Sequence, residues 1–139
     1  MATFQKFNQF VEDLAKGVHN LSTGQLKVAL TNTAPVAANS VYADLTSPLA
    51  TTNLSGATPF NVTTTSCEQT SGTLTLVLVD LTLTATGAVG PFRYVVLYND
   101  TPSSPADPLI GWWDYASEVN MANTETFLID FAATTISLS

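Results

Sequence analysis

Residues Thr73 to Ala85 read TLTLVLVDLTLTA and contain the strongest strand pattern in the chain. Because successive side chains of a strand point to opposite faces, odd and even positions can be compared separately. The odd positions are mostly apolar throughout, whereas the even positions are leucine as far as Leu78 and polar from Asp80 onward. The first half is therefore apolar on both faces. Antiparallel sheets usually keep one face in water, so something must cover the second face.

The run from Phe92 to Tyr98 is also apolar on both faces. We expect an N-terminal helix to cover one of these patches and a neighbouring subunit to cover the other. Further strand patterns, bounded by turn residues, are typical of β-sandwiches and barrels. They occupy Leu26 to Leu30, Phe60 to Thr65, Leu109 to Tyr115, Glu125 to Phe131 and Thr135 to Leu138.

The sequence therefore predicts a mainly β protein, an antiparallel β-sandwich or barrel-like domain of about seven strands with one N-terminal amphipathic α-helix. We expect residues 1–139 to form a single domain, with a helical segment at 1–20 and a β domain at 25–139. Residues 37–59 are irregular and rich in polar residues and proline, which predicts a long loop or arm with a short helix around Ser40 to Leu45.

The first twenty residues have helical rather than strand periodicity. Thr3 is an available N-cap, and Gly17 is placed to end the helix at its C′ position. The predicted apolar face consists of Phe7, Phe10, Val11, Leu14 and Val18, and the predicted polar face of Gln9, Glu12, Asp13 and Lys16.

Charge and composition exclude several classes of function. The 139 residues include four basic and eleven acidic ones, for a net charge of -7, and the basic residues do not cluster. We therefore expect no nucleic-acid partner, since phosphate binding needs clustered Lys and Arg. No run approaches the roughly 18 apolar residues of a membrane span, and the N-terminus lacks the apolar region of a secretory signal. Both observations predict synthesis in the cytoplasm without export or membrane insertion.

Few residues are arranged for chemistry. The single histidine, His19, follows a helix end without a nucleophile motif nearby, and Cys67 lies in a polar stretch without adjacent bases. Asp100, Asp107 and Asp114 lack the spacing of a calcium loop, and zinc would need more His and Cys ligands. We predict a protein that is not an enzyme, uses no metal or cofactor, and has no small-molecule ligand.

Trp112 and Trp113 are adjacent, so in a strand they must point to opposite faces. One is expected in the core and the other on the covered second face; the alternative is an exposed platform for sugar rings. Arg93, the sole arginine, is predicted to form a buried or interfacial ion pair with a carboxylate such as Asp114 or Asp130.

Several strings of the chain resemble small structural proteins of tailed bacteriophages. These strings are FNQFVEDLA at 7–15, HNL at 19–21, LKVALTNTAP at 26–35, GPFRY at 90–94 continuing to YNDT at 98–101, and DPLIGWWDY at 107–115. The resemblance covers most of the chain outside 37–59 and suggests a capsid decoration, or cement, protein.

Such proteins commonly bind as trimers where capsomers meet, so the resemblance implies a homotrimer on the capsid surface of the virion, made in the host cytoplasm, with the major capsid protein as partner. We expect the interface to include Phe7, Phe10, Leu14, Arg93, Trp112 and Trp113. A tail or fibre component and a carbohydrate-binding β-sandwich module are the alternative hypotheses.

Overall fold

A computed structural model describes residues 3–50, 52–55, 60–131 and 135–138. Within these ranges the chain forms ten strands in three antiparallel sheets. The largest sheet has five strands in the order β1-β8-β7-β2-β3. In that order the strands are Phe4–Lys6, Leu109–Met121, Val89–Asn99, Leu26–Thr31 and Asn61–Val62.

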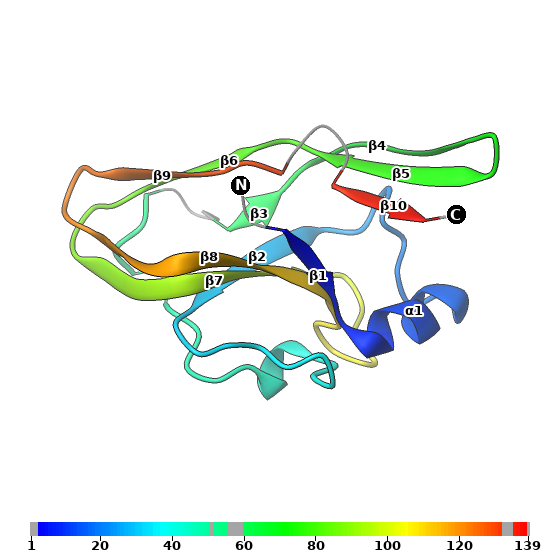
Figure 1. Ribbon diagram of the computed structural model, residues 1–139, viewed down its shortest axis with the longest axis horizontal. Coiled ribbons are helices and arrows are strands. Elements are labelled where there is room, and N and C mark those ends of the chain that lie inside the picture. The colour runs from blue at the N-terminus through cyan, green and yellow to red at the C-terminus, as the bar shows by residue number, and fades with distance from the viewer. Residues whose placement is uncertain (1–2, 51, 56–59, 132–134, 139) are drawn as a thin grey trace.

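Two smaller sheets lie side by side in a second layer, at the top of Figure 1. One has the order β10-β5-β4 (Ile136–Leu138, Thr73–Leu78 and Thr64–Thr70), and the other pairs β6 (Leu81–Thr84) with β9 (Thr126–Ile129). The prediction of a mainly β, antiparallel, sandwich-like fold with one α-helix is confirmed. The described residues form ten strands rather than about seven, because β1 was not predicted and two predicted strands, Phe60 to Thr65 and Thr73 to Ala85, are each divided in two.

The divided strand is the run from Thr73 to Ala85. In β5 the buried side chains are at even positions, Leu76 and Leu78, whereas in β6 the buried one is Leu83, at an odd position. The strand conformation is interrupted at Val79 and Asp80, between β5 and β6. Odd rather than even positions face the core after this interruption. The run therefore looks apolar on both faces partly because its core-facing positions change from even to odd. The expectation of one continuous strand was wrong.

The main cluster of buried residues lies between the two layers, and it includes Leu26, Leu76, Phe92, Leu97 and Phe131. A second cluster lies on the other side of the five-stranded sheet. It consists of Phe7, Ala29, Leu45, Val96, Tyr98 and Leu109, with Tyr42 and Trp112 packed against it.

Residues 36–50, which we call the arm, cover that second face. The arm contains a short 3-10 helix, η1 (Tyr42–Asp44), and runs beneath the five-stranded sheet in Figure 1. Leu45 of the arm is buried in the second cluster, and the Tyr42 ring lies 5.0 Å from that of Tyr98. The chain's own arm thus covers the second face of β7, where the sequence predicted either the N-terminal helix or a neighbouring subunit.

The helix α1 (Asn8–Ala15) is shorter than predicted. Thr3 is not its N-cap, because Phe4–Lys6 form β1 instead, which pairs with β8 as far as Gly111. A Cβ atom at Gly111 would lie 2.3 Å from the Phe4 ring, so this position must be glycine for β1 to dock. Gly17 ends the helix with a φ of +78°, as predicted.

Within the described residues, no helix is long and apolar enough to cross a membrane.

Candidate functional site

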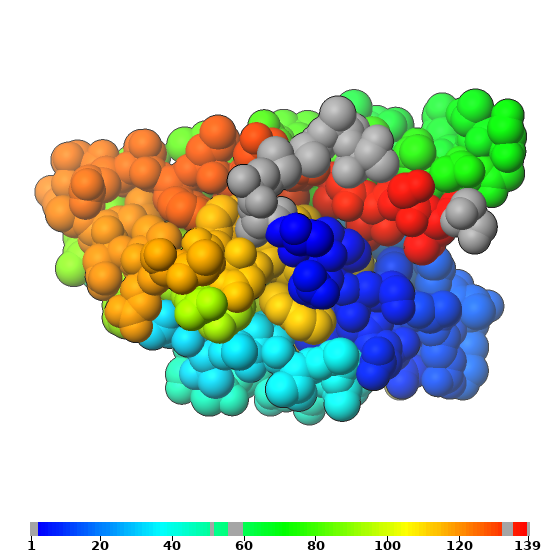
Figure 2. All heavy atoms as spheres, viewed as in Figure 1, coloured from blue at the N-terminus to red at the C-terminus, as the bar shows by residue number. Residues whose placement is uncertain are grey.

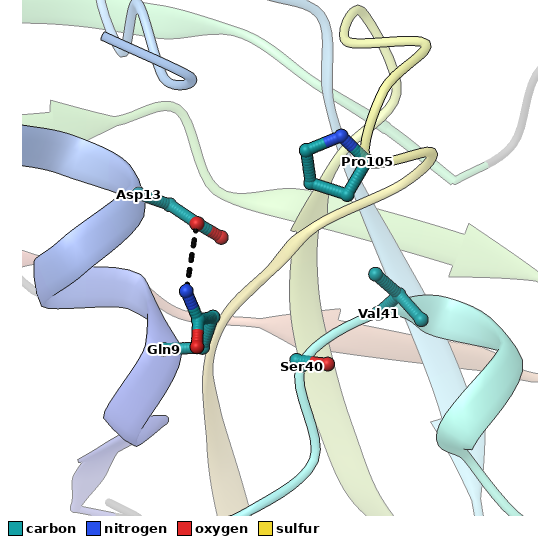
Figure 3. A pocket seen from close by; sticks show the side chains of 5 residues that line it. All are labelled: Gln9, Asp13, Ser40, Val41 and Pro105. Atoms are coloured by element: carbon teal, nitrogen blue, oxygen red, sulfur yellow. Dashed lines mark hydrogen bonds between the residues drawn. The ribbon is translucent and has the colours of Figure 1, made fainter. Parts of the chain in front are cut away.

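A pocket of about 240 Å³ lies where α1, the arm and the loop between β7 and β8 meet (Figure 3). The helix contributes Gln9 and Asp13, the arm contributes Ser40 and Val41, and the loop contributes Pro105. In the space-filling view the helical segment, in blue, and the arm, in cyan, lie next to each other on the lower side of the molecule (Figure 2).

Backbone hydrogen bonds fix the arm against its neighbours at this pocket. The amide of Asn8, at the start of α1, donates to the carbonyl of Ala37 at 2.9 Å, and the amide of Leu109 donates to the carbonyl of Ser40 at 3.0 Å. The amides of Ser40 and Val41 donate to Oδ2 of Asp44 at 2.8 and 3.2 Å. These bonds lower the pKa of Asp44 and hold the arm in a defined turn beside the pocket.

Asp13 is the unusual residue of the pocket. It was expected on the polar face of the helix, but only 4% of its surface is exposed, because the arm and the loop fold over it. Its Oδ1 accepts a hydrogen bond from Nε2 of Gln9 at 3.0 Å, whereas its Oδ2 has no partner among the described residues and points away from the helix in Figure 3. Burying an unpaired carboxylate oxygen is unfavourable, so this atom needs an explanation.

The predicted apolar face of α1 contains a residue that is exposed instead of buried. Phe10 and Leu14 pack in or against the main cluster as expected, but Val11 is 51% exposed. Phe7 precedes the helix and belongs to the second cluster. Of the predicted interface residues in this segment, Phe7 and Phe10 are fully buried inside the chain itself.

His19 is buried beside Phe10, with 5.3 Å between the ring centroids. Its Nδ1 lies 3.2 Å from Nδ2 of Asn99, so the neutral ring accepts this hydrogen bond and carries its proton on Nε2, which has no partner. Burial lowers the pKa of His19, and the charge of Asp13 opposes that shift. His19 is thus held in the core by its contact with Asn99.

Trp112 and Trp113 point to opposite faces of β8, as predicted. Trp113 is buried in the main cluster, with its ring 5.2 Å from that of Phe4. Trp112 is half-buried against Phe7 in the second cluster, with 4.5 Å between ring centroids. Both rings are thus packed against the chain's own aromatic residues, which leaves no open tryptophan pair as a sugar platform.

Arg93 pairs with Asp114, one of its two predicted partners. Nε and a terminal nitrogen of Arg93 donate to the two carboxylate oxygens at 2.7 and 3.0 Å. The guanidinium, followed by the backbone amide of Ala116, lowers the pKa of Asp114. The side chains are 38% and 42% exposed, so the pair is not buried, and exposed pairs contribute little to stability.

Asp100 and Asp107 lie close together at the other end of the loop. Burial raises the pKa of Asp107, and the hydrogen bond and negative charge of Asp100 raise it further. Nζ of Lys27 lies 3.1 Å from Asp100. No group of three or more His, Cys, Asp or Glu side chains in the described part of the chain could hold a metal ion. Cys67 packs against the main cluster, and burial raises the pKa of its thiol.

The outward side of the second layer has a distinct character. The residues on this side are those that alternate along the strands with the residues that face the core. They are Ser66, Glu68, Thr70, Thr73, Thr75, Val77, Val79, Thr82, Thr84, Thr126 and Leu128. We call this surface the outer β face. Glu68 is the only charged residue among them, and Val79 and Leu128 are large apolar side chains that are 49% and 54% exposed. Two further exposed carboxylates, Asp80 and Asp130, lie beside this surface, next to β6 and β9.

Comparisons with protein-family models, with curated proteins and with solved structures found no match for this chain.

Proposed function

We propose that this protein is a structural component of a phage virion that binds the outer surface of the capsid as a homotrimer and stabilises the mature shell by bridging capsomers. The strings that resemble phage structural proteins motivate the hypothesis, and the β-sandwich is compatible with it. The single structural observation that carries the proposal is the outer β face.

This surface is suited to contact with another protein. Apart from Glu68, and from Asp80 and Asp130 beside it, its side chains are uncharged, so most of this surface can be covered without desolvating a charge. Covering Val79 and Leu128 would remove apolar area from water, and each Å² buried would stabilise the complex by about 25 cal/mol. Strands pair within each of the two sheets of this layer, so each part of the contact surface is ordered before binding, which lowers the entropic cost.

A cement protein works through mass action and copy number. A ligand that binds the assembled shell but not the dissociated capsomers stabilises the shell by RT ln(1 + [L]/Kd) for each site, where [L] is the free ligand concentration. A trimer that contacts several capsomers at once converts modest contacts into a strong attachment, because the second and third contacts are intramolecular.

The test is binding of the purified protein to shells that lack it, measured by co-sedimentation. The double variant Val79→Asp with Leu128→Asp places two charges on the outer β face and should lower the affinity at least about tenfold. The matched control is Val11→Asp with Val36→Asp, which changes two equally exposed valines outside that face. Loss of binding in the control alone, or in neither variant, would contradict the proposed surface.

The homotrimer is tested separately by sedimentation equilibrium at micromolar concentration, where a compact monomer would contradict it. The alternative location, in the tail or a fibre, is tested by electron microscopy of virions that carry a labelled copy of this protein. Label over the head supports decoration, and label confined to the tail overturns it.

A further inference from the structure

We propose that the pocket between α1, the arm and the β7–β8 loop binds the primary ammonium group of a lysine side chain that a protein partner presents. The proposal goes beyond the decoration role and does not depend on the outer β face. Its basis is Oδ2 of Asp13, a buried carboxylate oxygen without a partner in a pocket large enough for a side chain (Figure 3).

The unpaired oxygen determines the charge and the shape of the occupant. A cation is needed to offset the cost of a buried carboxylate. An arginine would use both carboxylate oxygens in its planar fork, but Oδ1 of Asp13 is already bonded to Gln9. An ammonium is a compact charge whose three donors lie in no common plane, so one of them can bond to the single free oxygen.

The other walls of the pocket favour an alkyl chain behind that charge. Val41 and Pro105 are apolar, and the four methylene groups of lysine pack well along such surfaces while the charged end is bound. A calcium ion would need six to eight oxygen ligands, and Asp13 is the only carboxylate among the lining residues. The pocket thus matches an alkyl ammonium better than a metal ion.

The occupant must come from another molecule. Lys16 is paired with Glu12, Lys27 is paired with Asp100, and Lys6 lies in β1 opposite Gly111. The net charge of -7 attracts a basic partner. A free diamine would leave its second ammonium without a carboxylate in the pocket, whereas the far end of a lysine side chain is the backbone of its own protein. We therefore assign the occupant to a protein side chain.

The experiment is a titration followed by NMR of the backbone amides of α1 and the side-chain amide of Gln9. The probe is Nα-acetyl-lysine methylamide, and its uncharged counterpart is Nα-acetyl-norleucine methylamide. We expect saturable shifts with the lysine probe alone, with a dissociation constant on the order of 1–10 mM for an isolated side chain. An absence of saturable shifts would overturn the proposal and leave a buried water as the partner of Asp13.

Two variants separate the pocket from the general negative charge of the protein. Asp13→Asn should weaken binding of the lysine probe at least about tenfold, because an amide nitrogen replaces the anionic acceptor. Asp13→Asn is isosteric and removes a buried charge, so its thermal midpoint should be at least that of the parent protein. Glu12→Gln changes the net charge equally on an exposed side of the same helix and should change binding less than about twofold.

Equal weakening in both variants would overturn the proposal, because it would show attraction to the overall charge. Cadaverine is the last probe in the experiment. If this free diamine binds ten times more tightly than the lysine probe in an Asp13-dependent way, the occupant is a free amine and the assignment to a protein partner fails.

Discussion

The two hydrophobic clusters lie on opposite faces of the same five-stranded sheet, but they are built differently. The main cluster lies between two layers of strands. The second cluster has the sheet on one side and the irregular arm on the other. The comparison shows that strand periodicity reports which faces are apolar, but not what covers them.

The arm is attached by fewer contacts than a strand would be. The hydroxyl of Thr31 donates to the carbonyl of Thr46 at 2.7 Å, and the amide of Leu49 donates to the carbonyl of Leu30 at 2.8 Å. Regions with few such contacts can open locally without global unfolding. The second cluster should therefore be the less cooperative of the two, and the same substitution in each cluster tests this difference.

The largest effect is expected for Leu97→Ala in the main cluster. Leu97 is fully buried on the central strand β7, so truncation leaves a cavity that the two sheets cannot close. Unfolding in urea should show a loss of about 3–5 kcal/mol in the free energy of unfolding. A loss below about 1 kcal/mol would contradict a rigid main cluster.

The matched substitution in the second cluster is Leu45→Ala. The arm can move toward the sheet and fill part of the space, so the loss should be about 1–2 kcal/mol. Hydrogen exchange should become faster at the amides of Leu45 and Leu49 but not in β7. If Leu45→Ala costs as much as Leu97→Ala, the arm is part of one cooperative core and the distinction fails.

A smaller, pH-dependent effect should distinguish two aspartates that flank the second cluster. The pKa of Asp107 is raised on folding, so its carboxyl group lowers stability as the pH rises above the ordinary Asp range. Asp107→Asn should therefore be more stable than the parent protein at pH 7 and equal to it near pH 3. Thermal unfolding at pH 3, 5 and 7 measures this difference.

Asp44→Asn is the control with the opposite sign. The pKa of Asp44 is lowered by amide donors of the arm, so its carboxylate contributes stability above the ordinary Asp range, and this is lost as the pH falls through the lowered pKa. The variant should be less stable than the parent protein at pH 7, with no difference at low pH. The same direction of change in both variants would show that net charge, rather than local contacts, controls the pH dependence.

The smallest effect is expected for the ion pair of Arg93 and Asp114, which lies in neither cluster. Both side chains are more than a third exposed, so Arg93→Ala should destabilise the protein less than either leucine substitution. A double-mutant cycle with Asp114→Ala measures the coupling of the pair. A coupling as large as the effect of Leu45→Ala would indicate a structural role that its exposure does not explain.

The sequence predicted the fold class because alternation and turn residues are local properties. It did not predict the interruption at Val79 and Asp80, because β5 and β6 both have strand patterns. The change in which positions face the core becomes visible only when their different partner strands, β10 and β9, are known. It placed Thr3 in the helix because Phe4–Lys6 have no strand periodicity of their own. Their strand conformation depends on pairing with β8, which is more than a hundred residues away in sequence.

The candidate pocket was not predictable from sequence for the same reason. Asp13 lies at a polar position of an amphipathic helix, and nothing near it in sequence distinguishes it from Glu12. Its burial comes from the arm and the loop that contains Pro105, which reach it from elsewhere in the chain. By contrast, the opposite orientation of Trp112 and Trp113 follows from adjacency in a strand and was predicted correctly.

The arm also leaves and rejoins the five-stranded sheet at neighbouring strands. It follows β2 and leads to β3, and these strands pair with each other, with Leu26 opposite Val62. Both ends of the connection between β2 and β3, which includes the arm, are thus anchored in the same sheet. Because the entropy of closing a loop grows only with the logarithm of its length, doubling the length costs about 0.6 kcal/mol. Exposed positions such as Thr46 and Ser47 should therefore accept inserted peptides, including an epitope for locating the protein in electron micrographs.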